Sequence, residues 1–347
     1  MTCGCDQQAE SAKPAKTTPS FAERLEQSWY RPSILTLFLL PLSVLFSWVT
    51  ALRRWLFRRG WLAVTQLPVP VIVVGNISVG GTGKTPLTLW LCQYLQQQGL
   101  KPGILSRGYG VKLTKPTLVS PAMAASEVGD EPLLLAKLAQ VPVVVWPARA
   151  AGGQFLLANT DCNVIICDDG LQHYALARDL EIILIDGQRG LGNGLLLPAG
   201  PLREGRSRLN TADLVLSNSA ASDHTPYQLT ISPQNPISLL AEQTPLMPPQ
   251  PVTLVSGIGN PNRFVTTAQA AGYAITDTRF FPDHHPFTAK DLSDIQGPVL
   301  MTAKDAVKCQ AFAQPNWYYL PITAQLPVAA EQIIQQKIQQ IRSRYGL

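Results

Sequence analysis

The chain has 347 residues, a net charge of +5 and a hydrophobic content of 46%, but charged residues make up only 15% of it. This length allows two domains of ordinary size, and an average soluble protein has about 25% charged residues, so the deficit indicates extensive burial or contact with lipid. The positive charge is concentrated in Arg53, Arg54, Arg58 and Arg59, without a basic stripe interleaved with aromatic residues, and we expect no nucleic-acid partner. The six cysteines show no metal-ligand spacing beyond a C-x-C near the start, which fits a reducing cytosol without structural disulfides.

The first part of the chain divides into a polar segment and an apolar one. Residues 1–20 are polar, with scattered proline, threonine and lysine, and we expect them to be disordered. Residues 34–52 are uncharged, and as a helix they would measure about 28 Å, close to the roughly 30 Å hydrocarbon core of a bilayer. Arginines follow directly and tryptophans flank the segment, as interface anchors do.

Several interpretations of this apolar segment are open. A cleaved signal peptide is disfavoured, because the segment starts late and no small-residue cleavage site precedes the arginines. A transmembrane helix, a helix seated in the inner leaflet, a hairpin broken at Pro41 and an internal core helix are the alternatives. We expect residues 21–60 to form a membrane-associated helical segment.

The segment from Val71 to Pro86 has the pattern of a triphosphate-binding loop. A β-branched run leads into a glycine-rich turn that ends in Gly-Lys-Thr, and an apolar helix follows. Glycines let backbone N–H groups surround the phosphates of ATP, Lys84 supplies positive charge, and the Thr85 hydroxyl can bind Mg²⁺. The strict pattern has a glycine where Ser78 stands, and a simple tight turn is the alternative. The strand before the loop and the helix after it favour a nucleotide site.

Strands and helices alternate from Val69 onward. This alternation predicts an α/β fold in which a P-loop NTPase-like parallel sheet, over residues 61–217, has helices on both faces. Ligands of such sheets bind beyond the carboxyl ends of the strands. The predicted strands are Val71–Val74, Gly103–Ser106, Val141–Val145, Val164–Cys167, Glu181–Ile185 and Leu214–Leu216, and the predicted helices include Leu87–Gln98, Pro132–Ala139 and Ala148–Asn159.

Acidic residues lie at the ends or starts of several of these elements. Asp168 and Asp169 end an apolar strand, where a carboxylate can reach Mg²⁺ directly or through water. Asp130 precedes Pro132 and is either a helix N-cap or a general base near the γ-phosphate. Asp186 ends the next strand and is a weaker candidate.

Basic and polar side chains accompany these acids. His173 follows Asp168 closely enough to hydrogen-bond the same cluster. A glycine- and proline-rich loop carries Arg203 and Glu204, and Arg107 follows another strand; both loops suit an anionic substrate, although a solvated basic loop is the alternative.

The character of the chain changes near Asn218. Residues 218–251 are rich in serine, proline and glutamine and are expected to be a linker, and residues 252–347 a second, smaller α/β domain. In this domain Asp283 and His284 form an Asp-His pair that can tune a catalytic carboxylate, whereas zinc is improbable because no third ligand is suitably spaced.

Taken together, these segments resemble the tetraacyldisaccharide 4'-kinase family, the lipid A 4'-kinases of Gram-negative bacteria, from about Trp29 to Lys308. The displaced glycine at Ser78 is the family's own form of the loop, whereas the turn before Arg149 departs from the Gly-x-x-Arg that we expect. The resemblance rests on Gly75-Asn76, Gly80-Gly81-Thr82-Gly83-Lys84-Thr85-Pro86, Ser106-Arg107-Gly108-Tyr109, Val128-Gly129-Asp130-Glu131-Pro132, Asp168-Asp169-Gly170-Leu171-Gln172-His173, Leu197–Glu204, Pro282-Asp283-His284-His285 and Thr302–Lys308.

The resemblance implies transfer of the ATP γ-phosphate to the 4'-hydroxyl of a tetraacylated disaccharide 1-phosphate, which gives lipid IVA. It also implies a location at the cytoplasmic face of the inner membrane, where the enzyme contacts the lipid surface, and an active site between two α/β domains. No protein partner can be inferred.

The resemblance further implies roles for individual residues. Asp130 would be the base, assisted by His284 and Asp283. The expected ATP-binding residues are Ser78, Val79, Gly80, Gly81, Thr82, Gly83, Lys84 and Thr85; the expected Mg²⁺ residues are Thr85, Asp168, Asp169 and Glu204; the expected substrate-binding residues are Arg107, Gln172, His173 and Arg203.

Two other function classes compete with a lipid-sugar kinase. A membrane-bound P-loop ATPase or GTPase switch would need a water-positioning residue and a base-specific motif such as Asn-Lys-x-Asp, and the sequence has neither. A non-enzymatic nucleotide sensor would leave Asp130, Asp168 and the Arg203–Glu204 loop without a purpose.

Overall fold

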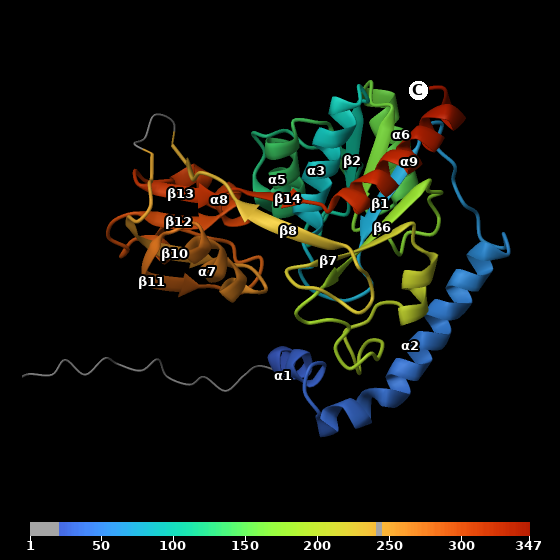
Figure 1. The fold of residues 1–347 in the computed structure, drawn as a ribbon, viewed down its shortest axis with the longest axis horizontal. Helices are drawn as coiled ribbons and strands as arrows, with labels where there is room; N and C mark the ends of the chain where they lie inside the picture. Colours follow the sequence, from blue (N-terminus) through green and yellow to red (C-terminus); the bar gives the residue numbers. More distant parts are fainter. Residues whose placement is uncertain (1–20, 241–244) are drawn as a thin grey trace, which may run out of the picture.

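The computed structural model describes residues 21–240 and 245–347, so the expectation for residues 1–20 lies outside it. Within these ranges the strands form a sheet of nine strands and another of five (Figure 1). The strand order of the larger sheet is β14-β8-β7-β6-β1-β5-β2-β4-β3. Its strands are β1 (Val71–Gly75), β2 (Pro102–Ser106), β3 (Thr117–Leu118), β4 (Val143–Val145), β5 (Val164–Asp168), β6 (Leu180–Asp186), β7 (Leu214–Asn218), β8 (Gln228–Pro233) and β14 (Ile322–Gln325).

The larger sheet is parallel except at its two edges, where β3 and β14 run antiparallel to their neighbours. Strands β1, β5 and β6 are buried along their whole length, because helices cover both faces, and this explains why they read as continuous apolar runs. One face packs against α3 (Lys84–Gln97), α5 (Asp130–Ala139) and α9 (Val328–Tyr345), and the other against α6 (Arg149–Asn159). The doubly covered parallel sheet is the predicted fold class, now confirmed.

The smaller sheet has the order β11-β10-β12-β13-β9, with the short β9 antiparallel at its edge. Helix α7 (Pro261–Ala270) packs on one face through Phe264, and α8 (Ala303–Cys309) packs on the other through Ala306 and Cys309. The strands are β9 (Ile237–Ser238), β10 (Pro251–Ser256), β11 (Ala274–Phe280), β12 (Val299–Thr302) and β13 (Trp317–Leu320), and shorter helical turns are α4 (Ala125–Val128), η1 (Arg206–Thr211), η2 (Ala289–Leu292) and η3 (Gln310–Phe312).

The connection between the two sheets differs from the expected linker over residues 218–251. Strand β8 joins the larger sheet beside β7, and β9 joins the smaller one. The chain then returns, because β14 pairs with β8 and α9 buries Ile334 and Ile338 against the core of the larger sheet (Figure 1). Two antiparallel strands therefore join the two halves, and residues 322–347 pack with the larger sheet.

Helix α2 (Ile34–Arg58) runs along the outside of the larger half, after the short α1 (Phe21–Ser28) (Figure 1). It begins at Ser33, whose hydroxyl accepts from the Leu35 N–H, and it continues through Pro41 without a break. Only 6% of the most apolar 18-residue stretch of α2 is buried. The Ser43 hydroxyl attaches the helix to the rest of the protein by donating to the Leu196 carbonyl at 2.7 Å.

These features exclude two of the alternatives for α2. The continuous helix excludes a hairpin broken at Pro41, and its exposure excludes an internal core helix. By length and composition it is the one helix among the described residues that could cross a membrane. Its exposed apolar side chains include Ile34, Leu37, Phe38, Leu42, Val44, Leu45, Trp48, Val49 and Leu52.

Candidate active site

The predicted phosphate loop connects β1 to α3 and is held from inside by Asn76. The Asn76 amide donates to the carbonyls of Ser78 at 2.7 Å and Gly80 at 3.3 Å, and its oxygen accepts from the Lys84 ammonium at 3.4 Å. Gly80 has a φ of +111°, a conformation that L side chains rarely adopt. The loop therefore keeps its shape through one buried amide that also orients the lysine.

A second asparagine supports the loop from the neighbouring strand β7. Asn218 donates to the Thr82 carbonyl at 3.1 Å, and a Cβ on Gly83 would lie 2.4 Å from the Asn218 amide nitrogen. Only glycine fits at position 83. The Thr82 hydroxyl is buried and has no hydrogen-bond partner among the described residues, which suits a site that receives a polar ligand.

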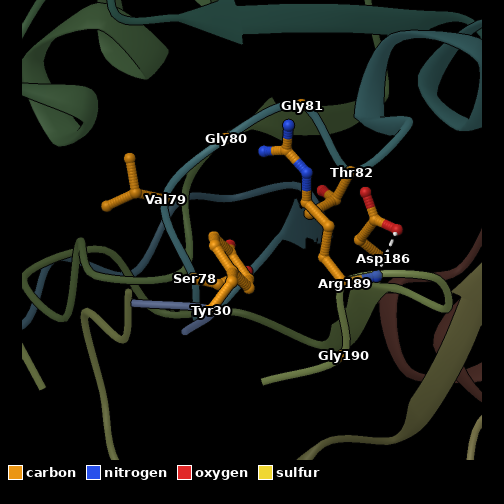
Figure 2. Close-up of a pocket in the computed structure, with 9 residues that line it drawn as sticks. All are labelled: Tyr30, Ser78, Val79, Gly80, Gly81, Thr82, Asp186, Arg189 and Gly190. Atoms are coloured by element: carbon orange, nitrogen blue, oxygen red, sulfur yellow. Dashed lines mark hydrogen bonds between the residues drawn. The ribbon is translucent and has the colours of Figure 1, made fainter. Parts of the chain in front are cut away.

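A small pocket opens beside the loop, as Figure 2 shows. The pocket is lined by loop residues 78–82 and by Tyr30, Asp186, Arg189 and Gly190. Asp186, the weaker candidate of the sequence, accepts from the Arg189 N–H at 3.1 Å and from Arg263 of α7 at 2.8 Å. Arg263 also donates to the Gly81 carbonyl at 3.4 Å. An arginine from the smaller half thus contacts the phosphate loop, a link that the sequence did not predict.

Asp168 and Asp169 end β5 directly beside the loop. Lys84 lies 3.5 Å from the Asp169 carboxylate, which also accepts from Arg203 at 3.1 Å, while Asp168 accepts from the Thr88 hydroxyl at 3.3 Å. Burial, together with the nearby negative charge of Glu131, raises the pKa of Asp168 to about 7. A buried carboxyl among other carboxylates is a place where a cation would be favourable.

The donor chemistry at this place fits Mg²⁺ better than a softer metal. Asp168, Asp169 and the Thr85 hydroxyl offer oxygen atoms, which Mg²⁺ prefers together with water and substrate phosphates. Among residues 21–240 and 245–347, no three His, Cys, Asp or Glu side chains gather into a ready-made metal site. Mg²⁺ here would accordingly depend on the nucleotide for further ligands.

Glu204, which the sequence grouped with the metal residues, lies in different surroundings. Its carboxylate is buried and accepts from the Gln172 amide at 2.9 Å and from the Tyr174 hydroxyl, and Arg208 lies 3.5 Å away. Gln172 also donates to the Asn76 carbonyl at 3.2 Å. Glu204 and Gln172 therefore brace the start of the phosphate loop.

Asp130 and His284 come together from opposite halves of the molecule. Asp130 is the first residue of α5, and the His284 Nδ1 lies 2.9 Å and 3.1 Å from its two carboxylate oxygens. Burial opposes ionisation of Asp130, but the hydrogen bond from His284 and the charge of Lys304 outweigh it and lower its pKa. The pair is therefore an ionised carboxylate with an oriented imidazole.

Three further charged side chains surround this pair. Lys304, from the first turn of α8, lies 3.1 Å from Asp283 and 3.4 Å from Glu131. The sequence singled out the segment around Lys304 without a role, because its contacts depend on how the two halves pack. Asp283 is half-exposed and lies 3.9 Å from the His284 Nε2.

Arginines converge around His173. Burial and the charges of Arg149, Arg107 and Arg53 together lower the pKa of His173 to about 4. Arg149 is 2% exposed and donates to the carbonyls of Trp146 at 2.9 Å and Asp168 at 3.4 Å. The imidazole is thus neutral in a region of positive potential, which suits an anionic substrate. Arg149 therefore lies in the site, beside Asp168, although the turn before it departs from the expected Gly-x-x-Arg pattern.

Comparisons with known proteins agree on one family. The family model described as tetraacyldisaccharide-1-P 4'-kinase matches residues 35–339. The tetraacyldisaccharide 4'-kinase of Shewanella baltica (strain OS185) is 47% identical over 313 residues, which cover 88% of this chain and 92% of that protein. The tetraacyldisaccharide 4'-kinase of Pasteurella multocida (strain Pm70) is 47% identical over 305 residues, which cover 86% and 94%.

A solved structure is similar over nearly the same region. The crystal structure of the "apo" form LpxK from Aquifex aeolicus in complex with ATP matches with a TM-score of 0.77 and 32% sequence identity. The match covers 89% of this chain and 99% of that chain. The similarity therefore extends over both sheets and is not confined to the nucleotide-binding half.

Proposed function

The chain belongs to the tetraacyldisaccharide-1-P 4'-kinase family, and we propose from this premise how its residues carry out the transfer. As a member, it is an ATP-dependent kinase of lipid A biosynthesis that phosphorylates the 4'-hydroxyl of tetraacyldisaccharide 1-phosphate to form lipid IVA. The ATP-bound relative supports ATP as the donor. The assignment of individual residues is our proposal.

Residues Ser78 to Thr85 hold the ATP phosphates. The backbone N–H groups of the loop surround the phosphates, and Lys84, held by Asn76 and Asp169, places its charge on the β- and γ-phosphates. Mg²⁺ bound near Asp168, Asp169 and Thr85 would neutralise charge that develops on the phosphate oxygens. Arg203 keeps Asp169 in place through its contact at 3.1 Å.

Asp130 acts as the general base for the sugar hydroxyl. The 4'-oxygen attacks the γ-phosphorus, the bond to the ADP oxygen breaks, and the hydroxyl proton passes to the Asp130 carboxylate. His284 holds the carboxylate through its Nδ1–H at 2.9 Å, and Asp283 lies on the far side of the ring. This contact between an acid of the larger half and a histidine of the smaller half is the observation that carries the proposal.

The positive region around His173 receives the anionic end of the substrate. Arg107 is exposed at the end of β2, and it lies close enough to His173 to lower its pKa. Gln172 turns its amide to Glu204 and the Asn76 carbonyl, which supports a bracing role beside the substrate site. We place the disaccharide between this region and Asp130.

Helix α2 brings the enzyme to its lipid substrate at the cytoplasmic face of the bacterial inner membrane. Its apolar side chains are exposed, and Arg54 near its end lies 3.9 Å from Glu204, so the membrane-facing element reaches the site. An acylated lipid leaves a bilayer at a cost of about 0.8 kcal/mol per CH₂ group, so transfer at the membrane surface is favoured.

Radiolabelled ATP tests the assignment directly. Label should appear on an extracted tetraacyldisaccharide lipid, with little release to water, and Lys84→Met should remove most of this transfer. A matched control is Lys101→Met, since Lys101 is an exposed lysine that pairs with Asp161 at 2.6 Å. Phosphate release without lipid labelling would instead indicate a P-loop ATPase switch.

A further inference from the structure

Helix α8 follows directly from β12, the central strand of the smaller sheet, and its first turn is firmly held. The Thr302 hydroxyl caps it by accepting from the Asp305 N–H at 3.2 Å and donates to the Asp305 carboxylate at 2.6 Å. The same carboxylate accepts from the Gly257 N–H at the end of β10 at 3.0 Å. Because Asp305 is completely buried, the first turn of α8 has little freedom to move. The backbone of Lys304, which lies in this turn, is therefore fixed.

From this turn, the Lys304 ammonium reaches across to the larger half. It lies 3.1 Å from Asp283, 3.4 Å from Glu131 and 3.7 Å from Asp130, and its side chain is only 15% exposed. Burying an ammonium group is costly unless partners surround it. Here carboxylates from α5 and from the loop after β11 compensate, so the position of the cation depends on both halves.

The same ammonium also faces the His284 ring on the side away from Asp130. Its Nζ lies 3.4 Å from the His284 Nε2, whereas the Nδ1 faces Asp130. An ionised carboxylate can only accept, so the Nδ1 must carry a proton. The Nε2 then accepts from Lys304 when it has no proton, and a second ring proton would point towards a cation. The geometry therefore points the Nδ1 proton at Asp130 and turns the Nε2 towards Lys304.

We propose that Lys304 is a positioning residue for the phosphoryl transfer, which fixes the tautomer of His284 and keeps Asp130 an ionised, correctly oriented base. The inference rests on the proposed role of Asp130. Lysine suits the task because one compact cation can face a ring nitrogen and several carboxylates at once.

The charges that face Asp130 determine how pH reveals this role. His284, on the loop after β11, and Lys304 and Lys308, on α8, act on Asp130 directly. Glu131 on α5 and Asp283 on the loop after β11 pair with Lys304, and the Tyr109 ring lies 5.3 Å from the His284 ring. Burial raises the pKa of Asp130, but the bond from His284 and the Lys304 charge outweigh it, and the pKa is lowered overall. For His284, the bond to Asp130 outweighs burial and the Lys304 charge, and the pKa is raised overall. Loss of the Lys304 charge moves both pKa values upward. The acidic limb of the activity profile should consequently move to higher pH.

Lys304→Met and Lys304→Arg in the full chain separate positioning from mere packing. We measure kcat for lipid phosphorylation against pH, with Lys290→Met, at an exposed position of η2, as the matched control. Lys304→Met should lower kcat at neutral pH by about tenfold or more, a part of the roughly 10²–10⁴-fold that a general base contributes. Its acidic limb should move to higher pH, whereas Lys304→Arg should keep the limb of the unmodified enzyme.

Other outcomes overturn the inference. An unchanged kcat in Lys304→Met does so, and so does a lower kcat with an unmoved acidic limb, since that shows packing alone. If Lys304→Met melts early, Lys304→Gln, which keeps a donor without the charge, answers the same question. Asp130→Asn in the same series separates the two proposals. If Asp130→Asn is inactive and the Lys304→Met limb is unmoved, only the Lys304 inference fails; if Asp130→Asn remains active, the proposed base is wrong as well.

Discussion

Replacing Asp130 with asparagine removes the proposed base while changing little else. The Asp130 side chain is 8% exposed, and the asparagine oxygen can still accept from His284, which lies 2.9 Å away in the unmodified chain. Lys304 retains Asp283 at 3.1 Å and Glu131 at 3.4 Å, so it does not become an unpaired buried cation. The new amide N–H group faces Lys304, and one imperfect contact of this kind costs about 1–3 kcal/mol of stability.

The effect on the rate should be far larger than this effect on folding. A positioned general base contributes about 10²–10⁴-fold, which corresponds to about 2.7–5.4 kcal/mol at about 1.36 kcal/mol per decade. The phosphate loop does not contact Asp130 directly, so binding of ATP should be little changed. We therefore expect kcat to fall by about two to four decades, with KM for ATP nearly constant.

Steady-state kinetics with radiolabelled ATP and the lipid acceptor measure this change, and thermal unfolding verifies the fold. Asp161→Asn is the matched control, because Asp161 has 79% of its side chain exposed and pairs with Lys101 at the surface. A folded Asp130→Asn enzyme with kcat within about tenfold of the unmodified one would refute the base assignment, because a general base typically contributes about 10²-fold or more.

Three further predictions test other parts of the structure. Gly83→Ala should weaken ATP binding in a nucleotide titration, since its Cβ would lie 2.4 Å from the Asn218 amide; Gly99→Ala has a similarly positive φ with open space and should bind ATP normally, and equal affinities would contradict the contact. The pKa of Asp168 is raised to about 7, so its contribution to stability is present at low pH and is lost as pH rises through that value. Without nucleotide and Mg²⁺, raising the pH from about 5 to about 8 should therefore lower the unfolding temperature of the unmodified chain relative to that of Asp168→Asn. A constant difference between the two unfolding temperatures would contradict the raised pKa of Asp168. Phe38→Ser with Trp48→Ser removes side chains that are 77% and 73% exposed on α2, each worth about 1.5–3 kcal/mol when buried in lipid. Sedimentation with anionic vesicles should fall sharply, whereas Val328→Ser on α9 should not change it; equal recovery of both variants would rule out α2 as the anchor.

The local order of residues was sufficient to predict the phosphate-binding half. The strand, the glycine turn and Lys84 are consecutive, and the carboxyl ends of parallel strands meet at one edge, so Asp168 had to lie near the loop. The family motifs likewise predicted Asp130 and His284. The position of Asp168 could be predicted because chain connectivity and sheet geometry determine it before any long-range packing is known, whereas the roles of Asp130 and His284 stay predictions from the family motifs.

Contacts between distant segments required the tertiary structure. The composition of residues 218–251 predicted a linker. Strand β8 lies between β7 and β14, and β14 comes about ninety residues later in the chain, so no local pattern reveals that pairing. The family motif predicted that Glu204 binds Mg²⁺. In the structure its carboxylate accepts hydrogen bonds from Gln172 and Tyr174 and lies beside Arg208. Composition showed that α2 is apolar, and only its position outside the core showed that its apolar side chains are exposed. No role for Lys304 followed from the sequence, for the same physical reason. The three carboxylates around it come from both halves of the molecule, and the packing of the two halves depends on side-chain fit that a linear pattern does not encode.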